Sequence, residues 1–144
     1  MIWLLRHGDA ENGSERADAD RRLTRKGEGQ SRAAGRALAA LDAGIDACIS
    51  SPKVRALDTA KLACEPLGVE VETSDALAGG DFDPLALAAG RGDVLLVGHE
   101  PDFSNAVADL TGARVKLKKG GIAAIEDGTL QALLRPAELD RIAG

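Results

Sequence analysis

The chain begins with Ile2-Trp3-Leu4-Leu5-Arg6-His7-Gly8, in which four apolar residues run directly into arginine, histidine and glycine. A similar run, Val94-Leu95-Leu96-Val97, leads into Gly98-His99. Continuous apolar runs of this kind are typical of central strands that are buried on both faces of a sheet. Both histidines of the chain therefore follow strands that we expect to lie in the middle of a sheet.

Predicted strands alternate with helical patterns along the rest of the chain. The strands are expected at Ile2–Leu5, Ala47–Ser50, Val69–Glu72, Val94–Val97, Ile122–Ile125 and Leu130–Leu134. Helical spacing predicts helices over Thr24–Leu41 and Pro52–Glu65, one from Pro101 onward and a short one after Asp83. This alternation is typical of a layered α/β domain with a largely parallel sheet. The last two strands predict a hairpin instead, because Asp127-Gly128 between them favours a tight turn.

Composition fits one globular domain over residues 1–144, large enough for a hydrophobic core. A net charge of −5, with one Trp, two Phe and no Tyr, disfavours a nucleic-acid partner, which needs a basic face or stacking side chains. No segment is long enough to span a membrane and the apolar start is too short for a signal peptide, so we expect a cytoplasmic protein. Cys48 and Cys64 lie too far apart for a zinc knuckle, so we expect buried free thiols and no metal or cofactor.

Three of the predicted strands are followed by residues that suit an anion. Arg6 and His7 follow the first strand, Arg55 follows the second and His99 follows the fourth. Ligands of open α/β sheets bind beyond the carboxyl ends of the strands. One such side chain alone would usually be a cap or a solvated group, but two imidazoles and two guanidiniums at one rim suit a phosphoryl group. Guanidinium forks match phosphate oxygens, and a histidine can act as a covalent nucleophile.

Two polar segments lie outside these positions. Asp9 to Arg22 is a loop that is long for a compact domain, which predicts a functional role for it. Arg114-Val115-Lys116-Leu117-Lys118-Lys119 is rich in cations and is interpreted as a charged edge strand that blocks edge-to-edge pairing. The alternative is a docking rim for an acidic partner protein or a polyanionic substrate.

Four motifs, in this order, resemble the histidine phosphatase (phosphoglycerate-mutase-like) superfamily. They are Arg6-His7-Gly8, Leu23-Thr24-Arg25-Lys26-Gly27, the block from Ser50-Ser51-Pro52 to Thr59-Ala60, and Val97-Gly98-His99, and together they span most of the chain. The resemblance implies a three-layer α/β/α sandwich with a mostly parallel central sheet. It also implies a phosphatase that works without a metal or cofactor.

The resemblance implies a role for each matching residue. His7 is the nucleophile that becomes phosphorylated, Arg6 and Arg55 clamp the phosphoryl oxygens, and His99 hydrogen-bonds the same group. Because the attacking nitrogen of His7 must be neutral, we expect its other nitrogen to donate to a backbone carbonyl. We expect Gly8 to let the backbone pass close to the ligand.

The chain departs from the family pattern at two positions. Many members place a glutamate after the third strand as proton donor to the leaving oxygen. Here Asp81 is the nearest acid and Asp83 the next, although Asp83 fits equally well as a helix N-cap before Pro84. Gly13 stands where mutases carry an asparagine, which argues against sugar-phosphate mutase activity. These departures and the small size resemble the short bacterial phosphohistidine phosphatases.

This resemblance implies a substrate, a phosphorylated histidine on a phosphotransfer protein. A site without a lid admits another protein's surface, and a protonated imidazole leaves readily, so a strong general acid matters less. One alternative is a small-molecule phosphomonoesterase that acts on a nucleotide, sugar phosphate or polyphosphate. Another is a non-catalytic phosphate-binding module, and the oligomeric state stays open.

Overall fold

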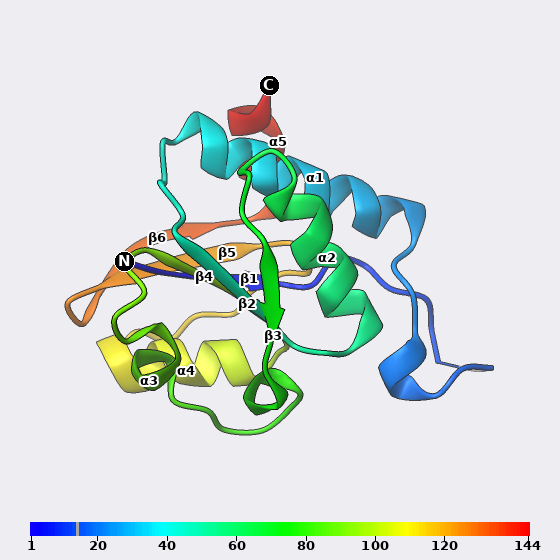
Figure 1. Cartoon of the computed structure of the whole chain (residues 1–144), viewed down its shortest axis with the longest axis horizontal. Helices are drawn as coiled ribbons and strands as arrows, with labels where there is room; N and C mark the ends of the chain where they lie inside the picture. Colours follow the sequence, from blue (N-terminus) through cyan, green and yellow to red (C-terminus); the bar gives the residue numbers. More distant parts are fainter. Residues whose placement is uncertain (14) are drawn as a thin grey trace.

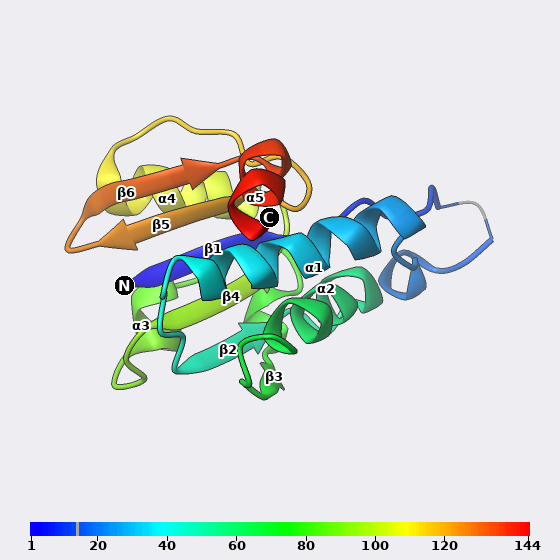
Figure 2. The same cartoon turned by 90° about the horizontal axis from the view of Figure 1, so that it is seen from above.

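The computed structural model describes residues 1–13 and 15–144, which form a six-stranded sheet between two layers of helices (Figures 1 and 2). The strands are β1 Ile2–Arg6, β2 Ala47–Ser50, β3 Val71–Thr73, β4 Val94–Gly98, β5 Ile122–Glu126 and β6 Thr129–Leu134. The α-helices are α1 Arg25–Ala40, α2 Val54–Cys64, α3 Pro84–Ala88, α4 Asp102–Thr111 and α5 Pro136–Ala143, and two short 3₁₀ helices are η1 Asp18–Asp20 and η2 Asp75–Leu77.

The sheet has the strand order β3-β2-β4-β1-β5-β6. The first four strands in this order are parallel, whereas β5 and β6 run antiparallel to their neighbours. Helices α1, α2 and α5 cover one face of the sheet, and α3 and α4 cover the other (Figure 1). The predicted three-layer sandwich with a mostly parallel sheet is therefore confirmed.

The central strands β1 and β4 explain the apolar runs of the sequence. Along β1, Trp3 and Leu5 pack into the core beneath α1, α2 and α5, whereas Ile2 and Leu4 pack into the core on the α3 and α4 side. Successive side chains of a strand point to opposite faces, so a strand covered on both faces is apolar at every position. The apolar run of β1 ends at Arg6, and that of β4 ends at Gly98, directly before His99.

Helix α1 begins after Thr24, whose side chain caps the helix by accepting a hydrogen bond from the Gly27 N–H at 3.1 Å. The helix packs closely on α2 because both helices have small residues where they meet. A Cβ atom at Gly35 would lie 2.2 Å from the Ala63 carbonyl oxygen of α2, so only glycine permits this approach. A core of alanines and aliphatic side chains can thus be dense with few aromatic residues.

Two local predictions are confirmed, the hairpin turn and the buried thiols. Asp127 and Gly128 both have positive φ angles, 48° and 73°, as a tight type I′ hairpin turn requires. Cys48 and Cys64 are buried free thiols. No described helix is both long and apolar enough to cross a membrane.

The structure corrects the interpretation of residues 114–119 as an edge strand. The segment contains neither helix nor strand, and the sheet edges are β3 and β6. The backbone of Leu117 is committed elsewhere: its N–H donates to the Glu100 carboxylate at 3.2 Å and its carbonyl accepts from Arg6 Nη1 at 2.9 Å. Helix α5 was not predicted, because its eight residues bury only one side chain fully, that of Leu139.

Candidate active site

The carboxyl ends of β1 and β4 bring the two histidines together. Arg6 pairs with Gly98 in the parallel register, and the His7 N–H donates to the Gly98 carbonyl at 3.0 Å. The next residue along each strand is therefore a histidine at the same level of the sheet. The two imidazole rings are buried, with their centroids 5.2 Å apart.

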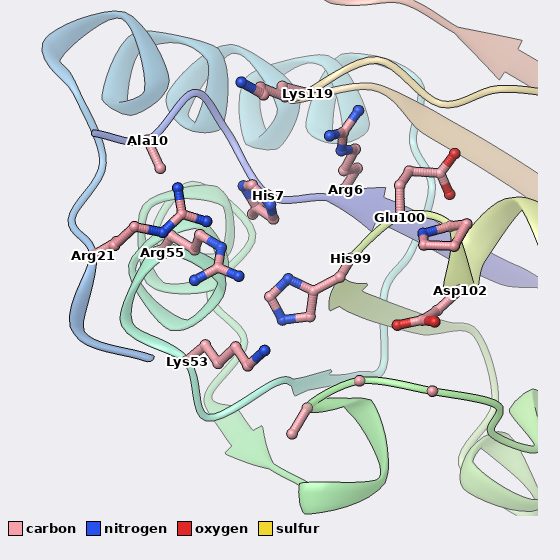
Figure 3. A pocket seen from close by; sticks show the side chains of 14 residues that line it. Arg6, His7, Ala10, Arg21, Lys53, Arg55, His99, Glu100, Asp102 and Lys119 are labelled. Atoms are coloured by element: carbon pink, nitrogen blue, oxygen red, sulfur yellow. The ribbon is translucent and has the colours of Figure 1, made fainter. Parts of the chain in front are cut away.

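The predicted arginines line the same pocket as the two histidines (Figure 3). Arg6 ends β1 and Arg55 lies in the first turn of α2, immediately beyond β2. The pocket has a volume of about 400 Å³, and its further lining includes Arg21, Lys53, Lys119, Glu100 and Asp102. Five cationic side chains and two carboxylates thus surround the imidazoles, so the pocket favours an anion.

His7 is held as a neutral base by burial and by one hydrogen bond. Its Nδ1 lies 2.7 Å from the Gly8 carbonyl oxygen, which can only accept, so Nδ1 carries the proton and Nε2 keeps its lone pair. Burial, opposed by the Gly8 contact and assisted by the charges of Arg55 and Arg6, lowers the pKa of His7 to about 4. The arrangement is the one expected for a neutral attacking nitrogen.

His99 is oriented by Ser51. Its Nε2 lies 2.8 Å from Ser51 Oγ, which also accepts the Lys53 N–H at 3.2 Å. The serine hydroxyl then has its own hydrogen free to donate to Nε2, which leaves Nδ1 of His99 as an N–H donor. That Nδ1 is buried without a partner among the described residues, and burial lowers the pKa of His99 to about 3.

These depressed pKa values predict a loss of stability as the pH falls. Unfolded imidazoles protonate near 6.5, whereas the folded rings stay neutral to about 4 for His7 and about 3 for His99. Between these values the unfolded chain binds more protons, so the free energy of unfolding decreases as the pH falls from 6.5 toward 4. We expect urea midpoints to fall across this window and to fall less steeply in His99→Gln. Parallel pH profiles of the wild type and the variant would contradict the burial of a neutral His99.

In the long loop after β1, Arg21 lines the pocket and Asp18 contacts Arg55. Arg55 donates from Nη1 to the Asp18 carbonyl at 2.8 Å and from Nη2 to the Asp18 carboxylate at 3.3 Å. The same carboxylate meets Lys53 at 3.2 Å and Arg21 Nε at 3.2 Å. The Lys53 hydrogen bond, followed by the charges of Arg55 and Lys53, lowers the pKa of Asp18 to about 2, although burial opposes this shift. Sequence reasoning singled out the loop but neither Asp18 nor Arg21.

The guanidinium groups of Arg6 and Arg55 each keep one hydrogen-bond donor without a partner among the described residues. The Nε atoms of Arg6 and Arg55 are buried and have no hydrogen-bond partner among the described residues. Arg6 is fixed by its bond to the Leu117 carbonyl, and the Leu117 N–H is in turn held by Glu100. Ser104 also donates its N–H and its hydroxyl to Glu100, so this carboxylate is committed to the framework that positions Arg6.

Gly8 packs against the start of α1. A Cβ atom there would lie 2.5 Å from the Gly27 carbonyl oxygen, so glycine is required by the close approach of the start of α1. The Gly8 N–H donates to Thr59 Oγ1 at 3.0 Å, and Gly8 is not among the residues that line the pocket. Its contribution to the site is to carry the carbonyl that fixes His7.

The acids near the pocket are arranged differently from the sequence-based expectation. Asp81 is exposed and does not line the pocket, and Asp83 caps α3 by accepting the Ala86 N–H at 3.2 Å. Asp102, the first residue of α4, does line it, opposite Arg55 and Lys53 in Figure 3. Burial raises the pKa of Asp102, although a hydrogen bond from the Gly80 N–H opposes this shift. Sequence reasoning missed Asp102; its position directly after His99-Glu100-Pro101 was the available signal.

The protein is a three-layer α/β sandwich that carries two histidines and two arginines at one end of its sheet. Comparison with known proteins identifies its family. The chain belongs to the histidine phosphatase superfamily (branch 1), whose family model matches residues 2–86. An uncharacterized protein of Picosynechococcus is 33% identical over 140 residues, which cover 88% of this chain and 85% of the relative.

Solved structures share the fold over nearly the whole chain. The protein histidine phosphatase SixA in complex with tungstate superimposes with a TM-score of 0.81 at 23% identity, covering 96% of this chain and 98% of that one. A candidate phosphohistidine phosphatase SixA from Nakamurella multipartitia gives a TM-score of 0.76 at 26% identity, covering 97% and 88%. The resemblance to this superfamily and to its short phosphohistidine phosphatases is therefore confirmed.

Proposed function

We propose that this chain is a phosphatase that transfers the phosphoryl group of its substrate to His7 and then to water. The observation that carries the proposal is the state of His7: a neutral, buried imidazole whose Nδ1 is tied to the Gly8 carbonyl, so that Nε2 is the available nucleophile in a cationic pocket. Nε2 forms a bond to phosphorus as the bond from phosphorus to the leaving group breaks. Water then attacks the phosphohistidine and returns the free imidazole.

The oxygens of the transferring group would be held by Arg6, Arg55 and His99. The Nε atoms of both arginines and Nδ1 of His99 are buried without a partner among the described residues, and all three residues line the same pocket. Donors fixed in advance stabilise charge that develops in the transition state without reorganising. In the free protein Asp18 occupies part of the Arg55 fork, so an arriving phosphoryl group competes with that carboxylate.

The proton for the leaving group would come from Asp102. Its carboxyl lines the pocket, and burial raises its pKa, which favours the protonated form that a general acid needs. Asp81 remains the acid predicted by sequence, but its side chain is exposed and outside the lining. Glu100 is less suited to the role because its oxygens already accept hydrogen bonds from Ser104 and Leu117.

The proposed substrate is a phosphorylated histidine on another protein. Similarity to SixA-type proteins supports this class, and the cleaved bond fits a modest acid, since a protonated imidazole is a good leaving group. A direct comparison of kcat/KM for a phosphorylated histidine phosphotransfer domain and for a panel of nucleotides, sugar phosphates and polyphosphates tests it. We expect the phosphotransfer domain to be preferred by roughly 100-fold. A small ester that is turned over faster would assign the chain to the phosphomonoesterases instead.

A further inference from the structure

A second groove adjoins the catalytic pocket and is lined by lysines. It has a volume of about 500 Å³ and shares the lining residues Arg6 and Lys119 with the catalytic pocket, so the two hollows lie side by side. Its other charged lining residues are Lys26, Lys116, Lys118 and a single acid, Asp9. We call this hollow the lysine groove.

The charge of the lysine groove is mostly unbalanced. Lys119 lies 3.4 Å from the Asp9 carboxylate, which also accepts the Thr24 hydroxyl at 2.7 Å. Within residues 1–13 and 15–144, no carboxylate comes within 4.0 Å of the ammonium groups of Lys26, Lys116 or Lys118. The whole chain carries a net charge of −5, so this cationic patch stands against the overall charge and attracts acidic groups locally.

The backbone that carries Lys116, Lys118 and Lys119 is hydrogen-bonded to the end of β1. Leu117, between Lys116 and Lys118, is 1% exposed and is anchored through its N–H and carbonyl to Glu100 and Arg6. The Gly120 N–H donates to the His7 carbonyl at 3.0 Å, just beyond Lys119. The exposed lysine side chains therefore extend from a backbone that is tied to the strand end carrying the nucleophile.

We propose that the lysine groove docks an acidic segment of a protein substrate, with carboxylates beside the phosphorylated side chain. This inference rests on the proposed function. The chemistry of the lining favours protein carboxylates over a second phosphate: the catalytic pocket uses arginine forks with buried donors, whereas the groove uses exposed lysines, which act as hydrated point charges. Such charges steer a protein surface over a distance without demanding one bonding geometry.

Two phosphohistidine peptides of equal length test the proposal, one flanked by glutamates and one by glutamines. At low ionic strength we expect the wild type to prefer the glutamate peptide in kcat/KM by roughly tenfold. The preference should disappear in the double variant Lys116→Gln/Lys118→Gln. It should persist in Arg36→Gln/Lys61→Gln, which removes the same charge from exposed positions on α1 and α2.

Fluorescence anisotropy with the unphosphorylated glutamate peptide supplies a readout that does not depend on turnover. Binding that is lost only in Lys116→Gln/Lys118→Gln supports the groove even if neither peptide is hydrolysed, a result that would count against the phosphohistidine substrate alone. Equal binding of the two peptides, or equal loss in both double variants, overturns the docking proposal. A third result would also overturn it. If the glutamate peptide is not preferred and inorganic tripolyphosphate inhibits the enzyme only when Lys116 and Lys118 are present, the groove binds a small polyanion instead.

Discussion

His7→Ala is expected to lose turnover of every phosphorylated substrate by at least roughly 10⁴-fold, as enzymes do when a covalent nucleophile is removed. The reason is that no other described group in the pocket combines a lone pair with the neutral, anchored state of His7. His99 is also neutral, but its Nε2 is engaged with Ser51. Rapid quenching with ³²P-labelled substrate should show acid-labile, alkali-stable label on the wild-type protein and none on the variant.

The folded state of the variant needs an independent check, because His7 is buried. Tungstate should still raise the unfolding temperature of His7→Ala, since Arg6, Arg55 and His99 remain to hold a tetrahedral anion. Label that survives on the variant would place the nucleophile elsewhere. A wild-type protein that binds tungstate but hydrolyses no aryl phosphate would support the non-catalytic phosphate-binding module.

Asp102→Asn is expected to lower activity most on the substrates with the poorest leaving groups. For an alkyl phosphate such as phosphoserine, whose oxygen needs a proton as it departs, we expect kcat to fall by roughly 100-fold or more. For p-nitrophenyl phosphate and for phosphohistidine the loss should be several-fold at most, because those groups leave without a strong acid. Steady-state kinetics on the three substrates provides the comparison.

The matched control is Asp81→Asn, which removes an exposed acid that is close enough to Asp102 to raise its pKa. We expect this variant to lose activity equally, and little, on all three substrates. A leaving-group dependence in Asp81→Asn and not in Asp102→Asn would return the acid role to the residue predicted from sequence. Equal losses on every substrate in Asp102→Asn would mean that this carboxyl positions the substrate and does not donate the proton.

The framework of the site was predictable from local sequence. A strand buried on both faces must be apolar throughout, so the runs before Arg6 and Gly98 identified the central strands β1 and β4. Parallel strands share one carboxyl edge, so residues that follow them directly must lie near each other. The positions of His7, His99, Arg6 and Arg55 along the chain are therefore enough to assign all four to one rim.

The acids and the lysine groove could not be predicted in this way. Asp81 and Asp102 both lie outside the strands, and only the path of the chain through residues 78–80 and the start of α4 determines which of them faces the imidazoles. The cationic residues of segment 114–119 alternate with apolar ones, a pattern that predicts an edge strand. Its backbone instead bonds to Arg6 and Glu100, partners that lie far away in the sequence.

The sequence alone determined the α/β class, the central strands and the edge of the sheet that carries the four candidate phosphate-binding residues. This was possible because burial and strand direction follow from patterns of neighbouring residues. Only the tertiary structure decided that Asp18 engages Arg55, that Asp102 enters the pocket and that four lysines adjoin it. These contacts join residues that are distant along the chain, and their geometry depends on how loops pack once the sheet and its helices are in place.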